Sequence, residues 1–151
     1  MIEVADVLGL EASVGRELAV SEWMEVSQSR IDRFANATAD EQWIHVDPAR
    51  AARESPYGAP IAHGFLTLSL MPALLRSAIE FSGPRMAINY GLNRVRFVSA
   101  VPAGARIRGR FTPLAVTPLD DHVDVIWAVT IERDGGDKPC CVVEWIARYI
   151  V

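Results

Sequence analysis

The stretch from His63 to Phe81 reads HGFLTLSLMPALLRSAIEF, and its apolar residues fall on nearly every face of a helix. A helix that is apolar all round belongs inside a protein, enclosed by other elements. The stretch is too short for a membrane span, which needs about 20 apolar residues in a row. Pro72 should bend or interrupt the helix, because proline lacks the N–H that a helical residue donates. The sequence therefore predicts a long buried helix over 63–81.

The second half of the chain has the composition of β-strands. Four runs are rich in Val, Ile, Arg, Trp and Tyr, with turn signals such as DGGD at 134–137 between them. Helical patterns precede these runs, with Ser27 and Asp47-Pro48 as helix starts. Helices followed by an antiparallel meander predict an α+β fold in which a sheet packs against the long helix. The four runs cover 86–99, 105–116, 122–133 and 140–151.

The composition is that of an ordinary globular chain. Of its 151 residues, 50% are hydrophobic and 23% are charged, and we expect one domain over 1–151. The net charge of −4 argues against a nucleic-acid partner, because such binding rests on a clustered basic surface. No run is long and apolar enough for a membrane span, and the acidic N-terminus is unlike a secretory signal. We therefore expect a cytoplasmic protein without a membrane or nucleic-acid partner.

The segment before the long helix carries the candidate chemistry. Residues 40–48 read DEQWIHVDP, which places the carboxylate of Asp40 five residues before the imidazole of His45. On an ideal helix these side chains would point about 140° apart, and on a strand they would lie on opposite faces. They converge only if an irregular turn joins them, and catalytic residues often lie on such loops. With Gly64 at the helix start, they are the groups needed to activate a water beside a polarised carbonyl.

A second histidine, His63, raises the question of a metal site. No third ligand at a usual spacing accompanies His45 and His63. We therefore expect no metal, and we expect His63 to brace the loop through hydrogen bonds.

Three segments together resemble the MaoC-like dehydratases, the family of (R)-specific, or type 2, enoyl-CoA hydratases. Their order and spacing agree with the family over essentially the whole chain. The resemblance implies a hot-dog fold, in which an antiparallel sheet wraps around a long central helix, and at least a homodimer. The segments are ATAD (37–40) with HVDP (45–48), IAHGFL (61–66), and INYGLNRVRF (88–97).

The resemblance also implies a reaction, the reversible addition of water to a trans-2-enoyl-CoA to give an (R)-3-hydroxyacyl-CoA. No cofactor is needed, since CoA is part of the substrate. Asp40 and His45 would hold and deprotonate the water, and the sequence leaves open which of the two takes the proton. The N–H of Gly64 would stabilise the negative charge that grows on the thioester oxygen.

Further side chains are expected to bind the substrate around this centre. Phe65 and Trp43 would exclude water from the oxyanion, and Gln42 would bind the water or the thioester. Arg96 would meet CoA phosphates across a dimer interface, or it would line a solvated sheet edge together with Arg94. The full set of expected substrate-binding residues is Gln42, Trp43, His63, Phe65, Asn93 and Arg96.

The chain departs from the family's pattern at two places. Ala39 and Gln42-Trp43 stand where many members have a glycine before the aspartate and Asn-Pro after it. A helix serine that supports the site in some members has no counterpart, and Pro72 lies near its position. Both differences leave Asp40 and His45 in place, so they bear on the acyl group that is accepted more than on the reaction.

Three other functions fit the same fold. A 3-hydroxyacyl-[acyl carrier protein] dehydratase would use the same two residues but bind a protein in place of free CoA. A hot-dog acyl-CoA thioesterase usually has its carboxylate on the central helix, where this chain offers none after Gly64 until Glu80. A non-catalytic acyl-binding module would have no need of both Asp40 and His45.

Overall fold

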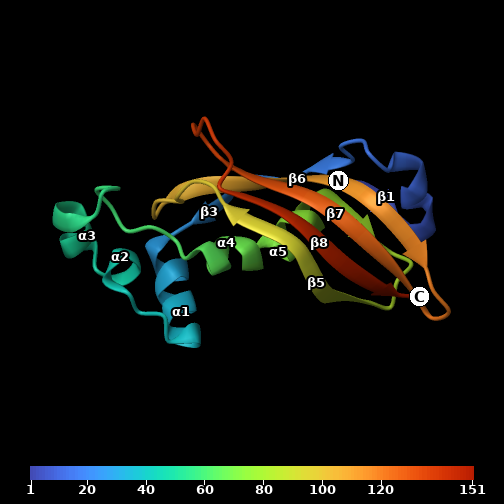
Figure 1. Cartoon of the computed structure of the whole chain (residues 1–151), viewed down its shortest axis with the longest axis horizontal. Coiled ribbons are helices and arrows are strands. Elements are labelled where there is room, and N and C mark those ends of the chain that lie inside the picture. Colours follow the sequence, from blue (N-terminus) through green and yellow to red (C-terminus); the bar gives the residue numbers. More distant parts are fainter.

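The computed structural model describes residues 1–151, and it consists of a curved sheet, two helices along one face of the sheet, and a group of helices that projects beyond one end (Figure 1). The main sheet has the strand order β2–β6–β7–β8–β5, and β3 also pairs with β6. The strands are β1 (Ile2–Val4), β2 (Ala19–Val20), β3 (Met24–Val26), β4 (Ile79–Phe81), β5 (Met86–Phe97), β6 (Ala105–Pro118), β7 (His122–Arg133) and β8 (Cys141–Ile150). The helices are the 3-10 helix η1 (Val7–Ser13) and the α-helices α1 (Gln28–Thr38), α2 (Trp43–Val46), α3 (Pro48–Glu54), α4 (Gly64–Ser69) and α5 (Met71–Ala78).

Strict alternation along β7 and β8 builds the core against α5. Val125, Trp127 and Val129 of β7 are fully buried, while the residues between them are half-buried on the other face. Leu74 of α5 belongs to the same core cluster as these side chains. The sheet with a helix on one face that the sequence predicts is therefore confirmed.

The strand order differs from the predicted meander at one point. Strands β6, β7 and β8 follow one another as expected, but β5 pairs with β8 at the far edge and not with β6. The connection 98–104 is longer than most hairpin loops, and it is held against the segment that enters α4. There the Ala62 N–H donates to the Val101 carbonyl at 2.8 Å, and the Ala103 N–H donates to the Pro60 carbonyl at 2.9 Å. These bonds carry the chain across the end of the sheet.

The central helix is interrupted and shorter than the sequence predicts. Leu70 separates α4 from α5 but keeps helical backbone angles, and Pro72 lies in the first turn of α5. This confirms the expected interruption near Pro72. The expected extension to Phe81 is wrong, because β4 begins at Ile79 and pairs in parallel with β1. The N-terminal strand β1 supplies the hydrogen-bond partners of β4, and the local sequence around Ile79 gives no sign of so distant a partner.

No helix in the structure combines the length and the apolar character needed to cross a bilayer.

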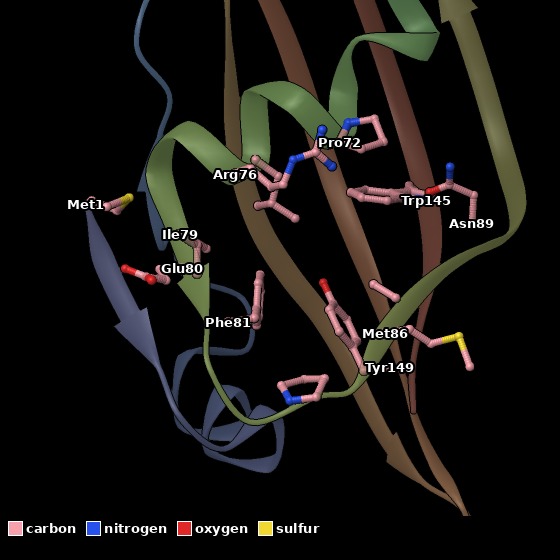
Figure 2. Close-up of a pocket in the computed structure, with 13 residues that line it drawn as sticks. Met1, Pro72, Arg76, Ile79, Glu80, Phe81, Met86, Asn89, Trp145 and Tyr149 are labelled. Carbon is pink, nitrogen blue, oxygen red and sulfur yellow. The ribbon is translucent and has the colours of Figure 1, made fainter. Parts of the chain in front are cut away.

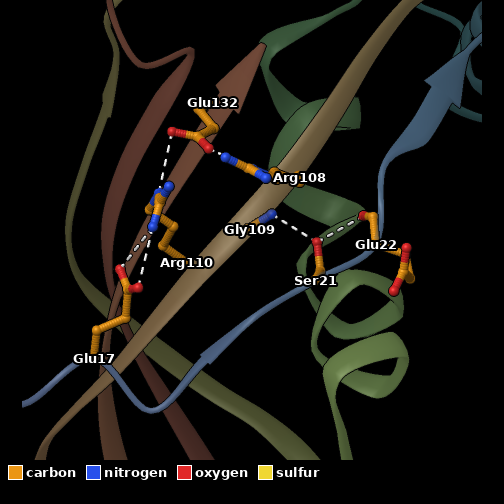
Figure 3. A network of polar contacts seen from close by, with 7 residues as sticks. All are labelled: Glu17, Ser21, Glu22, Arg108, Gly109, Arg110 and Glu132. Carbon is orange, nitrogen blue, oxygen red and sulfur yellow. Dashed lines mark hydrogen bonds and ion pairs between the residues drawn. The ribbon is translucent and has the colours of Figure 1, made fainter. Parts of the chain in front are cut away.

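A polar network joins β6 to β7 and to the chain around β2 and β3 (Figure 3). Arg108 and Arg110 of β6 both pair with Glu132 of β7. Between β2 and β3, the Ser21 hydroxyl accepts the Gly109 N–H at 2.8 Å, and the Ser21 N–H donates to the Gly109 carbonyl at 2.8 Å. These two bonds bridge the gap between β2 and β3. Because partly exposed ion pairs contribute only about 0–1 kcal/mol each, the network serves strand register more than stability.

The helices α1–α3 form the group that projects beyond the sheet (Figure 1). Ser27 caps α1 and Asp47 caps α3, each side chain accepting the N–H three residues further on, as predicted. At the other end of α1, Ala39 adopts a left-handed conformation with φ 58°. That conformation ends the helix and turns the chain into the segment that contains Asp40.

Candidate active site

Asp40, His45 and His63 come together where the projecting helices meet the start of α4. One ligand-type atom from each side chain lies within 4.8 Å of the others. Asp40 is exposed, whereas both histidines are buried. The irregular turn that the spacing of Asp40 and His45 requires is present. It consists of the left-handed Ala39, residues 40–42 without regular secondary structure, and the short helix α2 that returns His45 to the cluster.

The surroundings of His45 fix its tautomer. Its Nδ1 lies 2.6 Å from the backbone oxygen of Ile61, and a carbonyl can only accept, so Nδ1 carries the proton. Burial lowers the pKa of His45 and outweighs the opposing effect of that carbonyl, while His63 lowers the pKa further and Asp40 raises it. His45 is therefore neutral near pH 7, and its Nε2 is left as a hydrogen-bond acceptor.

His63 holds both of the other residues in place. Its Nε2 lies 2.8 Å from the backbone oxygen of Asp40, and its ring stacks on that of His45 with the centroids 3.8 Å apart. The Nδ1 of His63 is buried without a hydrogen-bond partner. The ring of Phe34 packs against the His63 ring, with the two ring centroids 4.9 Å apart. The hydrogen bond to the Asp40 segment is the bracing that the sequence predicts for His63.

Asp40, His45 and His63 are also the group of side chains whose ligand atoms lie close enough together to bind one metal ion. Three protein ligands and an open position are typical of catalytic zinc. Here Nδ1 of His45 and Nε2 of His63 are already bonded to carbonyl oxygens, and the ring planes are only 24° apart. Since a lone pair lies in the plane of its ring, stacked rings direct their remaining nitrogens side by side and not toward one point. The arrangement does not fit a shared metal, and a metal-free site stays a prediction.

Gly64 begins α4 directly after His63, and its N–H takes part in no hydrogen bond of the chain. A Cβ at this position would lie 2.9 Å from the ring of Phe97, so glycine is what allows the ring to pack here. Phe97 also meets Phe65 edge-on, with the ring centroids 5.8 Å apart. Two aromatic side chains thus lie at the start of α4. The sequence singles out Phe65, but Phe97 stands out only once β5 is placed.

The other residues predicted to bind substrate lie at two places, the start of α2 and the edge strand β5. Gln42 lies exposed just before α2, and Trp43 begins that helix with the guanidinium of Arg50 4.3 Å above its ring. Asn93 and Arg96 are exposed on the edge strand β5, and the Arg96 guanidinium donates to the backbone carbonyl of the preceding residue. Neither Asn93 nor Arg96 makes a hydrogen bond or ion pair with the cluster of Asp40, His45 and His63 within one chain.

Two adjoining cavities, of about 580 and about 350 Å³, lie between the central helix and β5. Figure 2 shows the larger one. They share Pro72, Asn89 and Trp145, and together we call them the α5–β5 groove. The smaller cavity begins at Leu68, about one helical turn beyond Gly64. The groove therefore starts about one helical turn from Gly64 and runs along α5. Its position depends on β5 lying at the far edge, which the sequence does not predict.

An antiparallel sheet wrapped around a central helix, with an acid and two histidines at the helix start, defines a hot-dog protein of the kind that the sequence indicates. Residues 10–133 match the family model of the MaoC like domain, and the chain therefore belongs to the MaoC-like family of dehydratases and hydratases. The family resemblance and the hot-dog fold drawn from the sequence are both confirmed.

Individual relatives agree with this assignment. The chain is 44% identical over 145 residues to 3-hydroxyacyl-thioester dehydratase Z of Mycobacterium tuberculosis (strain ATCC 25618 / H37Rv), covering 95% of each chain. It is 46% identical over 149 residues to nodulation protein N of Rhizobium meliloti (strain 1021), covering 97% of this chain and 90% of that one. Among solved structures, the (R)-hydratase from A. caviae involved in PHA biosynthesis superposes with a TM-score of 0.68 at 21% identity, covering 87% and 93% of the two chains. At that identity the last comparison supports the fold alone.

Proposed function

We propose that this protein adds water reversibly to trans-2-enoyl-CoA thioesters and forms (R)-3-hydroxyacyl-CoA thioesters. The observation that carries the proposal is the neutral His45, which lies in one cluster with the Asp40 carboxylate and His63, while the N–H of Gly64, the residue after His63, is unused. A close relative named as a 3-hydroxyacyl-thioester dehydratase supports the same reaction type.

In the proposed mechanism, the tautomer of His45 decides the direction of proton transfer. Nε2 takes a proton from a water that Asp40 also holds, and the water oxygen bonds to C3 of the substrate. The electron pair of the C2–C3 double bond moves toward the thioester oxygen. The proton on His45 then passes to C2, so that one water has been added in full. Acid–base assistance of this kind contributes about 10²- to 10⁴-fold in rate.

In the transition state, negative charge collects on the thioester oxygen. The N–H of Gly64 is the donor proposed for that oxygen, and one such donor can contribute roughly 3–4 kcal/mol. Phe65 and Phe97 cover this position from one side, which favours the exclusion of water. Gln42 and Trp43 would close it from the side of the projecting helices. The acyl chain would leave the site along the α5–β5 groove.

We also propose that the active form is at least a homodimer joined through β5. This strand pairs on one side only, and apolar side chains on it are exposed, including Met86 at 56% and Tyr90 at 57%. Proteins seldom leave a long apolar edge strand uncovered, because it invites pairing with other chains. A second copy on this edge would cover these side chains and bring its own Asn93 and Arg96 toward the substrate's CoA. A catalytically competent monomer in sedimentation experiments would contradict this part.

The test of function is the enoyl-thioester absorbance of crotonyl-CoA during incubation with the purified protein. We expect the band to decline, and an (R)-specific 3-hydroxyacyl-CoA dehydrogenase to consume the product. Release of free thiol without hydration would assign the protein to the thioesterases. Turnover of crotonyl groups on acyl carrier protein but not on CoA would favour the carrier-protein dehydratase. Binding of acyl-CoA with no turnover on either carrier would indicate an acyl-binding module.

A further inference from the structure

We propose that the α5–β5 groove selects acyl chains that end in a carboxylate, and that Arg76 of α5 binds this distal group. The inference rests on the proposed function in one respect, since it assumes that the thioester lies at Gly64. It adds a substrate class, the thioesters of long dicarboxylic acids, to a reaction that otherwise requires only an enoyl group.

Arg76 is a cation without a partner in this groove. It lines the larger cavity, and its guanidinium extends toward Pro72 and Trp145 (Figure 2). No hydrogen bond or ion pair joins it to another group of the chain. By contrast, Arg148 on the sheet forms a two-point ion pair with Asp124 at 2.7 and 2.8 Å. The difference indicates that Arg76 is not used to hold the fold together.

The one carboxylate in the wall of the groove does not neutralise Arg76. Glu80 lies on β4, at the end of the groove near Met1, and its carboxylate is directed away from Arg76 (Figure 2). Pro72 and Trp145 form an apolar wall beside the guanidinium. Arg76 is exposed in the unliganded protein, and an acyl chain lying in the groove against this wall would displace water from the guanidinium and strengthen its attraction to an anion. A guanidinium binds a carboxylate through two parallel hydrogen bonds, which makes it selective for that group.

Two further polar groups lie in the same groove. Tyr149 of β8 is 2% exposed, and the nearest polar group to its hydroxyl is the indole N–H of Trp127. Burial raises the pKa of Tyr149, so the hydroxyl stays protonated and can donate. Asn89 of β5 lines both cavities. The hydrogen of the Tyr149 hydroxyl has no acceptor in the chain, because the Trp127 indole can only donate, and a carboxylate oxygen on a ligand would accept it.

The distance from the reacting end sets the chain length. Arg76 follows Gly64 by twelve residues, or roughly 18 Å along a helix. An extended alkyl chain advances roughly 1.3 Å per carbon for a carbon–carbon bond of about 1.5 Å, so about 14 carbons span this distance, and about a dozen suffice because a helical side chain leans back toward the start of its helix. A short acyl group such as crotonyl would not reach Arg76.

The test compares two saturated, unreactive ligands of equal length by calorimetry, dodecanoyl-CoA and the mono-CoA thioester of dodecanedioic acid. We expect the protein to bind the dicarboxylic thioester at least about tenfold more tightly than dodecanoyl-CoA, because a hydrogen-bonded ion pair with Arg76 contributes an affinity of that size. Arg76→Gln should abolish the preference and leave crotonyl-CoA turnover unchanged. The matched control Arg16→Gln removes a charge in the connection between η1 and β2, outside the groove, and should keep the preference. Melting temperatures of both variants show whether they are folded.

The outcomes separate this inference from the proposed reaction. Equal affinity for the two ligands in the unaltered protein would overturn the inference, whatever the turnover of crotonyl-CoA. Loss of the preference in both arginine variants would also overturn it, because the effect would then be one of net charge. A preference that depends on Arg76 in a protein that never hydrates crotonyl-CoA would uphold the binding site and reject the hydratase.

Discussion

The imidazole of His63 donates its Nε2–H to the backbone carbonyl of Asp40 at 2.8 Å, although the two residues are 23 positions apart. The bond leaves the Asp40 carboxylate free, and the same ring stacks on His45. One buried side chain therefore positions both members of the proposed acid–base pair without needing to touch the substrate.

Replacing His63 by phenylalanine should keep the stack and remove the hydrogen bond. We expect kcat for crotonyl-CoA to fall by roughly 10²-fold with a smaller change in KM, because a misplacement of about 1 Å has effects of that size. Stability should fall by only about 1 kcal/mol, since water can replace the lost donor at the exposed Asp40. His122→Phe, a histidine change on β7 away from the cluster, is the control. A normal kcat in His63→Phe would show that the bond does not position Asp40.

The proposed acid–base pair predicts a large loss of rate with little loss of folding. Asp40→Asn and His45→Gln should each lower crotonyl-CoA hydration by about 10²- to 10⁴-fold. The matched control is Glu41→Gln, which removes an exposed carboxylate next to Asp40 and should leave the rate nearly unchanged. Melting curves would show that the variants remain folded. Near-normal turnover in either Asp40→Asn or His45→Gln would remove that residue from the mechanism.

The pKa of His45 predicts how activity and stability depend on pH. Burial lowers it from the ordinary value of 6.5, so the unfolded chain binds a proton at this residue before the folded protein does. As the pH falls from 6.5 toward the folded pKa, this residue should therefore reduce the free energy of unfolding, whereas above 6.5 it should have no effect. Activity needs neutral His45, so the acid limb of kcat/KM for crotonyl-CoA should lie below pH 6.5. An acid limb at or above that value would contradict the assignment of His45 as the base.

Much of the fold could be predicted because its signals are local. Ser27 and Asp47 cap their helices from positions that the sequence identifies, and the alternation along β7 marks its buried face. What could not be predicted depends on partners distant in the sequence. Ile79 leaves the helix because β1 pairs with it, and β5 crosses to the far edge because the loop after it is held by the segment before α4.

The candidate site shows the same division. The sequence requires an irregular turn between Asp40 and His45, and the structure contains one. It does not indicate that Ala39 would make this turn, because alanine seldom adopts a left-handed conformation. The approach of Phe97 to Gly64 joins the end of a strand to the start of a helix, and no spacing within either segment predicts it.

The close approach of Phe97 gives a prediction for Gly64→Ala. The added Cβ would meet the Phe97 ring at 2.9 Å, so the ring must move, at a cost of about 1–3 kcal/mol in stability. The Cβ would also keep the thioester from the Gly64 N–H, and kcat/KM for crotonyl-CoA should fall. Phe97→Ala combined with Gly64→Ala should restore stability to that of Phe97→Ala alone but not the rate. Recovery of the rate in the double variant would show that the ring, and not access to the N–H, limits activity.

The left-handed backbone at Ala39 predicts that glycine would be better there. The conformation costs an L-residue roughly 1–2 kcal/mol, whereas glycine adopts it freely and loses roughly 0.5–1 kcal/mol through its more flexible unfolded chain. Ala39→Gly should therefore raise the free energy of unfolding by about 0.5–1 kcal/mol, measured by urea denaturation, and leave turnover intact. The matched control is Ala37→Gly, two residues earlier on the exposed side of α1, which should lower stability by about 1 kcal/mol. If both substitutions lowered stability to the same extent, Ala39 would not hold the strained turn that delivers Asp40 to the site.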